Sequence, residues 1–362
     1  MMLLTDAYGA HGGIAKFNRD LIESIASTPG CAEVVCLPRL IPQPMQALPE
    51  RVRYVTEAAR STARFLSCAL KTLIQGPFDL VVIGHINLSP LGVWLARRQR
   101  APSMLFIHGI DAWQRHHRNS VVRAMPHLDH VVGVSEVTLS RFRAWSGVPA
   151  TRTSVLPNSV DLERFTPGPK APDLVEQLAL QGRTVLMTFG RLASEDRCKG
   201  FDEIIEVMGS LLEQRPELVY LICGTGPDQA RLQAKCRQLG VDQAVRFSGF
   251  VPEARKVDYY RLADAYVMPS QGEGFGIVFL EAMACGIPAM GSSLDGGREA
   301  LLDGQLGELV NAAVPAEVRA GIERTLARAK GRPDGLSLFS IHAFAGRVQQ
   351  LIRNTLRPAT TA

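Results

Sequence analysis

The 362-residue sequence lacks several features that would assign a function class at once. No apolar run approaches the roughly 18 to 20 residues that a membrane helix requires, and the first residues, Met1–Asp6, are not a basic segment followed by a long apolar stretch. The seven cysteines form no C-x-x-C pair and no zinc-like spacing with a histidine. We therefore expect a cytoplasmic protein with reduced, mostly structural cysteines and no metal site.

What the sequence does contain is typical of a folded globular protein. Hydrophobic residues make up 46% and charged residues 21%, so disorder is excluded. The length is too great for one ordinary core and fits two domains of common size.

Short apolar, β-branched runs alternate with longer amphipathic segments along the chain, which indicates parallel sheets. The runs are Leu80–Ile83, Met104–Ile107, His130–Val134, Val185–Phe189, Val219–Cys223, Tyr266–Met268 and Ile287–Met290. Thr166–Pro172 is the most proline-dense stretch, so we place the linker there. The prediction is an α/β protein of two facing doubly wound domains, with ligands at the carboxyl ends of the strands.

The predicted domain boundaries follow from this linker. Residues 1–165 form the first domain and residues 166–338 the second, while residues 339–362 include an amphipathic C-terminal helix that begins near Leu338. The first 165 residues hold 18 Lys/Arg against 12 Asp/Glu, and the remainder holds 22 against 23. The basic first domain, with Arg97–Arg100 and Arg115–Arg118, either is ordinary solvated surface or attracts an anionic partner.

The strongest motif is the glycine-rich segment Ser270–Met283, directly after a predicted strand. Its glycines let the backbone approach a ligand, and the helix that begins after Gly276 would present free N–H groups to a diphosphate. Glu273 in the loop and Glu281 in the helix could accept hydrogen bonds from sugar and ribose hydroxyls. The competing interpretation is a helix cap and a surface charge.

A second motif supplies two cations after another strand. Gly190-Arg191 follows Val185–Phe189, and Lys199-Gly200 opens the next predicted helix. Such a pair can stabilise a departing diphosphate where other enzymes use a metal ion, and no D-x-D sequence stands in such a loop.

Three histidines are further candidates in the first domain. His108 follows the Met104–Ile107 strand and could bond a sugar hydroxyl, although an isolated histidine is more often structural. His85 at a strand end and His11 beside Gly12-Gly13 are also plausible cleft residues, but their spacing does not single them out. The G-x-G at Gly224–Gly226 is too short to predict a dinucleotide site.

The order and spacing of Gly190-Arg191, Lys199-Gly200 and Glu273 to Glu281 resemble the family 4 retaining glycosyltransferases of GT-B type. The resemblance implies a nucleoside diphosphate sugar as donor substrate, no cofactor, and a C-terminal helix that returns to the first domain. It implies a catalytic set and a donor-binding set: catalytic His108, Arg191, Lys199 and Glu273; donor-binding Gly12, Gly13, Gly190, Val251, Gly274, Phe275, Gly276, Ile277 and Glu281. One departure is Arg298, where many relatives have an apolar residue or proline.

The resulting hypothesis is a metal-independent transferase that moves a hexose to a saccharide or lipid-linked acceptor, in polysaccharide or glycolipid biosynthesis. The expected partners are the donor, the acceptor and an anionic membrane surface contacted peripherally through Arg115–Arg118, but no nucleic acid. Two alternatives stay open. One is a nucleotide-sugar epimerase of the same architecture, and the other is a non-catalytic homologue.

Overall fold

A computed structural model describes residues 1–194 and 197–356 of the chain. They divide into two compact units. Unit 1 contains Met1–Ser159 together with helix α14 (Ile341–Leu356), and unit 2 contains Val160–Ser340. Among these described residues, no helix combines the length and apolar character needed to cross a bilayer. All seven cysteines carry free thiols.

Unit 1 is built on a seven-stranded parallel sheet with the order β3-β2-β1-β4-β5-β6-β7. The strand bounds are β1 (Met2–Leu4), β2 (Val34–Pro38), β3 (Val52–Tyr54), β4 (Val81–Ile83), β5 (Ser103–Ile107), β6 (His130–Gly133) and β7 (Thr153–Val155). The helices are α1 (Gly13–Ala26), α2 (Thr62–Ile74), α3 (Ser89–Gln99), α4 (Ile110–Trp113), α5 (Asn119–Ala124), α6 (Glu136–Ser146) and α14. The order reverses between β1 and β4, which is where such sheets open for ligands.

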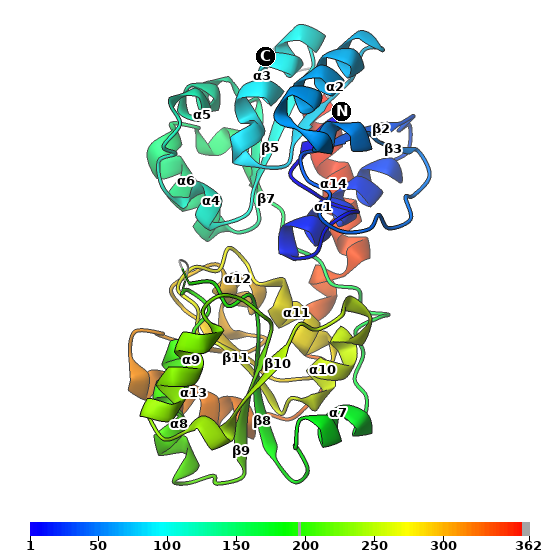
Figure 1. Ribbon diagram of the computed structural model, residues 1–362. Coiled ribbons are helices and arrows are strands. Elements are labelled where there is room, and N and C mark those ends of the chain that lie inside the picture. The colour runs from blue at the N-terminus through cyan, green and yellow to red at the C-terminus, as the bar shows by residue number, and fades with distance from the viewer. Residues whose placement is uncertain (195–196, 357–362) are drawn as a thin grey trace. The chain divides into compact units, whose positions relative to one another are not determined.

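The two faces of this sheet are covered by different helices. Leu3 and Val35 pack under α2 and α3, and neighbouring strand residues such as Met2 point to the opposite face because side chains alternate along a strand. Helix α14, coloured red in Figure 1, lies against the blue helix α1. The rings of Phe17 and Phe344 meet edge to face there, 5.6 Å apart.

Unit 2 repeats the same plan with six parallel strands in the order β10-β9-β8-β11-β12-β13. The strands are β8 (Thr184–Phe189), β9 (Leu218–Cys223), β10 (Val245–Gly249), β11 (Ala265–Met268), β12 (Ala289–Ser292) and β13 (Glu308–Val310). The helices are α7 (Pro172–Gln177), α8 (Phe201–Leu212), α9 (Gln229–Gln238), α10 (Lys256–Leu262), α11 (Ile277–Ala284), α12 (Gly297–Ala300) and α13 (Pro315–Ala327). Helices α8, α9 and α13 close one apolar core with strand residues such as Leu186, Tyr220 and Val267.

These two sheets confirm the predicted fold class of two doubly wound α/β domains. The division between the units falls at Val160, earlier than the predicted boundary at residue 166. The reason is that the Val160 N–H donates a hydrogen bond to the Phe339 carbonyl at 2.8 Å, so the segment that begins at Val160 packs with unit 2. Phe165 is fully buried and packs against Tyr260 of the same unit.

Two predicted elements begin two or more residues later in the structure than the sequence pattern indicates. Strand β12 begins at Ala289 rather than Ile287, because Pro288 has no N–H to give to the sheet and only its carbonyl bonds the Tyr266 N–H, at 2.8 Å. The last helix begins at Ile341 rather than Leu338, because Ser340 has extended backbone angles after a short 3-10 turn. Of the predicted C-terminal segment, residues 357–362 lie outside the described residues.

Candidate donor site

The glycine-rich loop follows β11 and leads into α11, as the sequence predicted. Gly276, just before the helix, has φ of 89°, and a Cβ there would lie 2.5 Å from the Phe279 ring. A Cβ on Gly296 would lie 2.0 Å from the Gly274 carbonyl oxygen, so the loop rests directly on the backbone that precedes α12. No side chain caps α11 and its first turn holds no acidic residue, which leaves its positive end available to an anion.

Lys199 and Glu273 form an ion pair at this loop. Both side chains are mostly buried, with 28% and 15% of their surfaces exposed. Burial by itself lowers the pKa of Lys199, but the attraction and hydrogen bond of Glu273 outweigh it, so the pKa lies above its ordinary value. A cation and a carboxylate are thus held together at the carboxyl ends of β8 and β11.

Asp295 is a further residue of this site that the sequence interpretation missed. Its carboxylate accepts hydrogen bonds from the backbone N–H of Glu273 at 2.8 Å and of Gly297 at 3.0 Å. Burial raises the pKa of Asp295 to about 6, although these bonds oppose the shift. Its position after β12 and before Gly296-Gly297 is the signal that could have identified it. Asp295 positions the Glu273 backbone.

Gly190 and Arg191 begin the loop after β8. The Gly190 N–H donates to the Cys223 carbonyl at 2.9 Å, and a Cβ on Gly190 would lie 3.7 Å from the Lys199 side chain. The structure therefore brings Gly190, Lys199 and Glu273 together. Arg191 is exposed and has no hydrogen-bond or ion-pair partner among the described residues.

Glu281 lies within α11 as predicted but is completely buried. Both of its carboxylate oxygens accept hydrogen bonds from the Lys256 ammonium group at 2.8 Å, and the Tyr260 hydroxyl donates to one of them at 2.7 Å. Tyr260 stacks on Phe189, the last residue of β8, with ring centroids 5.4 Å apart. The sequence interpretation missed Lys256 and Tyr260, because nothing in their spacing shows that α10 packs against α11.

The remaining predicted donor residues offer backbone rather than side chains. Phe275 is 1% exposed and packs edge to face on Phe339, and Ile277 is also buried. Val251 follows β10 and is buried as well. Only main-chain atoms of these residues could meet a ligand, so their donor-binding roles stay predictions.

In unit 1, His108 follows β5 as predicted. Its Nε2 lies 3.0 Å from the Gly84 carbonyl oxygen, and since a carbonyl only accepts, Nε2 carries the proton and Nδ1 is an acceptor. Burial lowers the pKa of His108 to about 4, so the ring is neutral at pH 7. The ring packs on Phe17, with centroids 5.0 Å apart, and the His108 backbone N–H donates to Asp111 at 3.2 Å. Burial also raises the pKa of Asp111 to about 7.

The other predicted residues of unit 1 lie at the ends of β1 and β4. Gly12 caps α1 with φ of 106°, and neither Gly12 nor Gly13 has an atom within 4 Å of a would-be Cβ. His85 accepts a hydrogen bond from the Asn87 N–H at 3.2 Å, and His11 is exposed. The proposed roles of these residues toward a donor stay predictions.

Comparisons with known proteins agree with the resemblance drawn from the motifs. The family described as "Glycosyltransferase Family 4" matches residues 11–164, and "Glycosyl transferases group 1" matches residues 172–333. The chain is 34% identical over 256 residues to a GDP-mannose-dependent alpha-(1-6)-phosphatidylinositol monomannoside mannosyltransferase of Mycolicibacterium smegmatis, covering 67% of this chain and 66% of the relative. It is 35% identical over 191 residues to a D-inositol 3-phosphate glycosyltransferase of Geodermatophilus obscurus, covering 50% of this chain and 42% of the relative. The chain thus spans less than two thirds of the length of these two relatives.

Solved structures share the fold at lower identity. The sucrose-phosphate synthase from Thermosynechococcus elongatus has a TM-score of 0.77 at 20% identity, covering 98% of each chain. The Anabaena protein HepE, in complex with UDP and glucose, has a TM-score of 0.72 at 19% identity, covering 97% of this chain and 99% of the other. The adjacent family matches, the curated relatives and the shared fold lead to one conclusion: this chain belongs to glycosyltransferase family 4.

Proposed function

We propose that the protein transfers a hexose from a nucleoside diphosphate sugar to a saccharide or lipid-linked acceptor, with retention of the anomeric configuration. The observation that carries the proposal is the Lys199–Glu273 pair, held at a glycine loop directly before the uncapped start of α11. A diphosphate would receive charge-assisted hydrogen bonds from Lys199 and Arg191 and from the first N–H groups of the helix.

In this mechanism the acceptor oxygen bonds to the anomeric carbon on the face from which the diphosphate departs. The bond between the anomeric carbon and the phosphate oxygen breaks, and the acceptor proton passes to that departing oxygen. Lys199 and Arg191 stabilise its growing negative charge, as preorganised donors do in other transferases. Glu273 would then exchange part of its bond with Lys199 for hydroxyl groups of the sugar.

The two other named residues take supporting roles. Glu281 would bind the donor ribose, and because Lys256 already occupies both of its oxygens, a ribose hydroxyl must share or replace that bond. Neutral His108 would accept a hydrogen bond from a sugar hydroxyl at Nδ1, which its bond to Gly84 leaves unprotonated.

The relatives support the proposed acceptor class. The Mycolicibacterium relative is named for a phosphatidylinositol mannoside acceptor, so a lipid-linked acceptor and peripheral contact with an anionic membrane belong to this proposal. The test is to incubate the protein with a panel of UDP- and GDP-sugars, with and without candidate acceptors, and to measure nucleoside diphosphate release. Release that requires an acceptor supports transfer. An isomeric sugar formed without an acceptor would favour the epimerase, and no turnover with any donor would favour a non-catalytic homologue.

A further inference from the structure

An apolar stripe runs along the outward face of helix α2 in unit 1. Leu66, Leu70 and Ile74 are spaced four residues apart, so they align on one side of the helix, and 44%, 46% and 83% of their surfaces are exposed. The opposite side of the helix is buried, where Phe65 and Ala69 pack into the core. Helix α2 therefore has two apolar sides, one buried in the core and one exposed to solvent.

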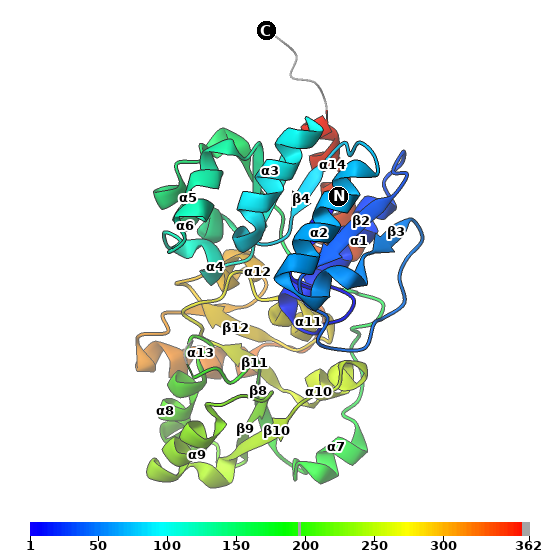
Figure 2. The same cartoon turned by 45° about the horizontal axis from the view of Figure 1, so that its top comes forward.

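Helix α3 lies beside α2. Figures 1 and 2 both show α2 and α3 side by side. Their C-terminal ends are joined by Gln99, whose side-chain amide donates to the carbonyls of Leu73 at 2.9 Å and Gly76 at 3.2 Å. Trp94 on α3 is 39% exposed and has the Arg98 guanidinium over its ring at 5.4 Å.

The charge around these apolar residues is mainly positive. Neither α2 nor α3 contains an acidic residue, and residues 56–110, which include the 3-10 helix packed against the start of α2, hold six Lys/Arg against two acidic residues, Glu57 and Asp79. Five of these cations lie on the two helices or at the C-cap of α3, and all five are exposed: Arg64, Lys71, Arg97, Arg98 and Arg100. We call these five residues, with Leu66, Leu70, Ile74 and Trp94, the α2–α3 face.

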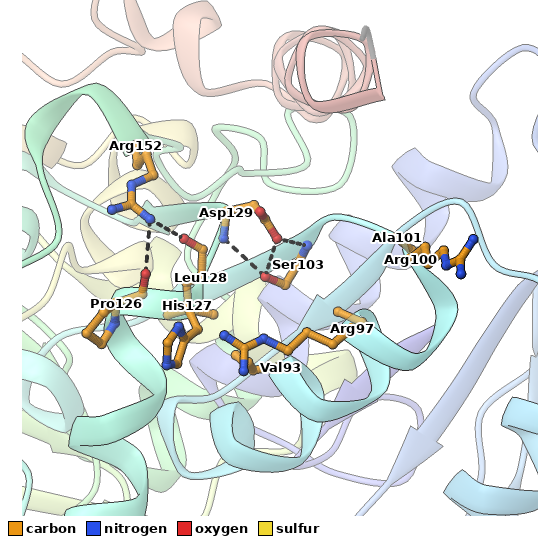
Figure 3. A pocket seen from close by; sticks show the side chains of 11 residues that line it. Val93, Arg97, Arg100, Ala101, Ser103, Pro126, His127, Leu128, Asp129 and Arg152 are labelled. Carbon is orange, nitrogen blue, oxygen red and sulfur yellow. Dashed lines mark hydrogen bonds between the residues drawn. The ribbon is translucent and has the colours of Figure 1, made fainter. Parts of the chain in front are cut away.

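A cavity of about 350 Å³ opens beside this face, at the amino ends of β5, β6 and β7. Figure 3 shows Arg97 pointing toward His127, with Arg152 on the far side and Arg100 pointing away. Arg152 donates to two main-chain carbonyls, at 2.9 and 3.2 Å. The one carboxylate of the lining, Asp129, accepts hydrogen bonds from the backbone N–H and the hydroxyl of Ser103 at 2.8 Å. The three arginines give this lining a net positive charge.

We propose that the α2–α3 face docks on an anionic lipid bilayer, with its leucines, isoleucine and tryptophan in the headgroup boundary and the neighbouring arginines on lipid phosphates. Exposed apolar residues flanked by basic ones are the combination that holds an amphipathic helix in a membrane interface. The cavity beside Arg97 can receive one such phosphate. The proposal rests on the membrane contact included in the proposed function and assigns that contact to a surface, the α2–α3 face, that contains none of the residues of the transfer reaction.

The same charge argues against two copies of the chain meeting through this face. A two-fold contact would place the five cations of one copy against the five of the other, which costs free energy. The apolar stripe distinguishes this face from the Arg115–Arg118 loop. That loop supplies cations and a stacked His116–His117 pair, but its described residues form no comparable apolar stripe. Binding through the loop alone would vanish in high salt, whereas binding through the α2–α3 face would keep an apolar component.

The test is sedimentation of the full chain with vesicles of phosphatidylcholine alone and of phosphatidylcholine mixed with phosphatidylglycerol, at low and high salt. We expect the wild type to bind the anionic vesicles far better than the neutral ones. Leu66→Ser/Leu70→Ser should lower the partition coefficient by about ten-fold or more, and Arg97→Glu/Arg100→Glu should lower it as much at low salt. The matched control is Leu239→Ser/Leu356→Ser, because those leucines are 45% and 43% exposed and lie elsewhere.

Three results would overturn the proposal. One is wild-type binding by Leu66→Ser/Leu70→Ser, and another is a loss seen only with Arg115→Glu/Arg118→Glu. The third is a change in oligomeric state, measured by analytical ultracentrifugation, in the α2 variant without any change in vesicle binding. Donor turnover with a water-soluble acceptor should be unchanged in the α2 variant, so this experiment fails or succeeds separately from the proposed reaction.

Discussion

Two lysine–glutamate pairs of unit 2, Lys199–Glu273 and Lys256–Glu281, join the same chemical groups but differ in their surroundings. Lys199 and Glu273 come from two loops and keep 28% and 15% of their side-chain surfaces exposed. Lys256 and Glu281 come from two packed helices, and Glu281 is completely buried with a third partner in Tyr260. The first pair can exchange partners with a ligand at its exposed surface, whereas the second also holds α10 against α11, so a ribose can reach Glu281 only by sharing or replacing a bond of that scaffold. The same chemical pair can thus serve turnover in one place and stability in the other.

The largest expected effect is on the free energy of unfolding, which should depend strongly on the Lys256–Glu281 pair. Lys256→Met leaves the buried Glu281 carboxylate without its cation, and breaking a buried pair costs about 3 to 5 kcal/mol of unfolding free energy. Urea unfolding followed by circular dichroism measures the change. Lys256→Met/Glu281→Leu should recover most of the loss, because no buried charge then remains. A single variant as stable as the wild type would show that the pair is not structural.

The next effect is on kcat, which should depend on the cations at the diphosphate. Lys199→Ala and Arg191→Ala should each lower kcat by about 100-fold or more, because each removes a cation from the departing diphosphate. Their unfolding midpoints should stay well above that of Lys256→Met. Folded variants with nearly normal kcat would remove these two residues from the reaction.

A smaller effect concerns the support of Glu273 by Asp295 and is visible as a pH dependence. The pKa of Asp295 is raised from 3.8 to about 6, so folded protein keeps a proton that unfolded protein releases. The stabilisation is complete below pH 3.8 and is lost as the pH rises to about 6, on the order of 2 kcal/mol. Asp295→Asn should lack this loss when unfolding free energies are compared from pH 4 to 7.

His108 provides the opposite slope as a control for that experiment. Its pKa is lowered from 6.5 to about 4, so its contribution is present above pH 6.5 and is lost as the pH falls to about 4. His108→Gln should reduce the acid-side loss of stability. An identical profile for wild type and both variants would contradict the assigned protonation states.

The last prediction is that removing divalent metal ions leaves the transfer rate unchanged. Because Lys199 and Arg191 supply the positive charge at the diphosphate, transfer should continue in excess EDTA. Initial rates with and without chelator measure this. Activity that disappears and returns with Mg²⁺ or Mn²⁺ would show that a divalent cation shares the role of Lys199.

The sequence predicted the fold well because both sheets are parallel and buried, so their strands appear as apolar runs bounded by turns. It also placed Lys199 and Glu273 in loops that follow strands, and the structure brings these two residues together at the edge where the strands end. It missed Lys256, Tyr260 and Asp295, whose contacts depend on how α10, α11 and the loop before α12 pack. Spacing within one segment carries no information about such tertiary partners.

The exposed apolar residues of the α2–α3 face could not be identified from the sequence either. The exposed Leu66, Leu70 and Ile74 have the helical spacing of core residues, and only the structure reveals that Phe65 and Ala69 fill the core instead. The sequence predicted the basic character of the first domain, but the membrane contact that it predicted lies at Arg115–Arg118 and not at α2 and α3.

The central claim is that the chain is a retaining transferase whose turnover depends on the Lys199–Glu273 pair and not on the charge of the Lys256–Glu281 pair. The most direct measurement is proton NMR of the product formed from a nucleoside diphosphate sugar and an acceptor, by wild type, Lys199→Ala and the stabilised Lys256→Met/Glu281→Leu. We predict a product with the same anomeric configuration as the donor, formed by wild type at full rate and by Lys199→Ala about 100-fold more slowly. The stabilised double variant should form the same product at a similar kcat. Its donor KM should be higher, because Glu281, the proposed ribose ligand, is gone. A product of inverted configuration, or equal rates for wild type and Lys199→Ala, would contradict the account.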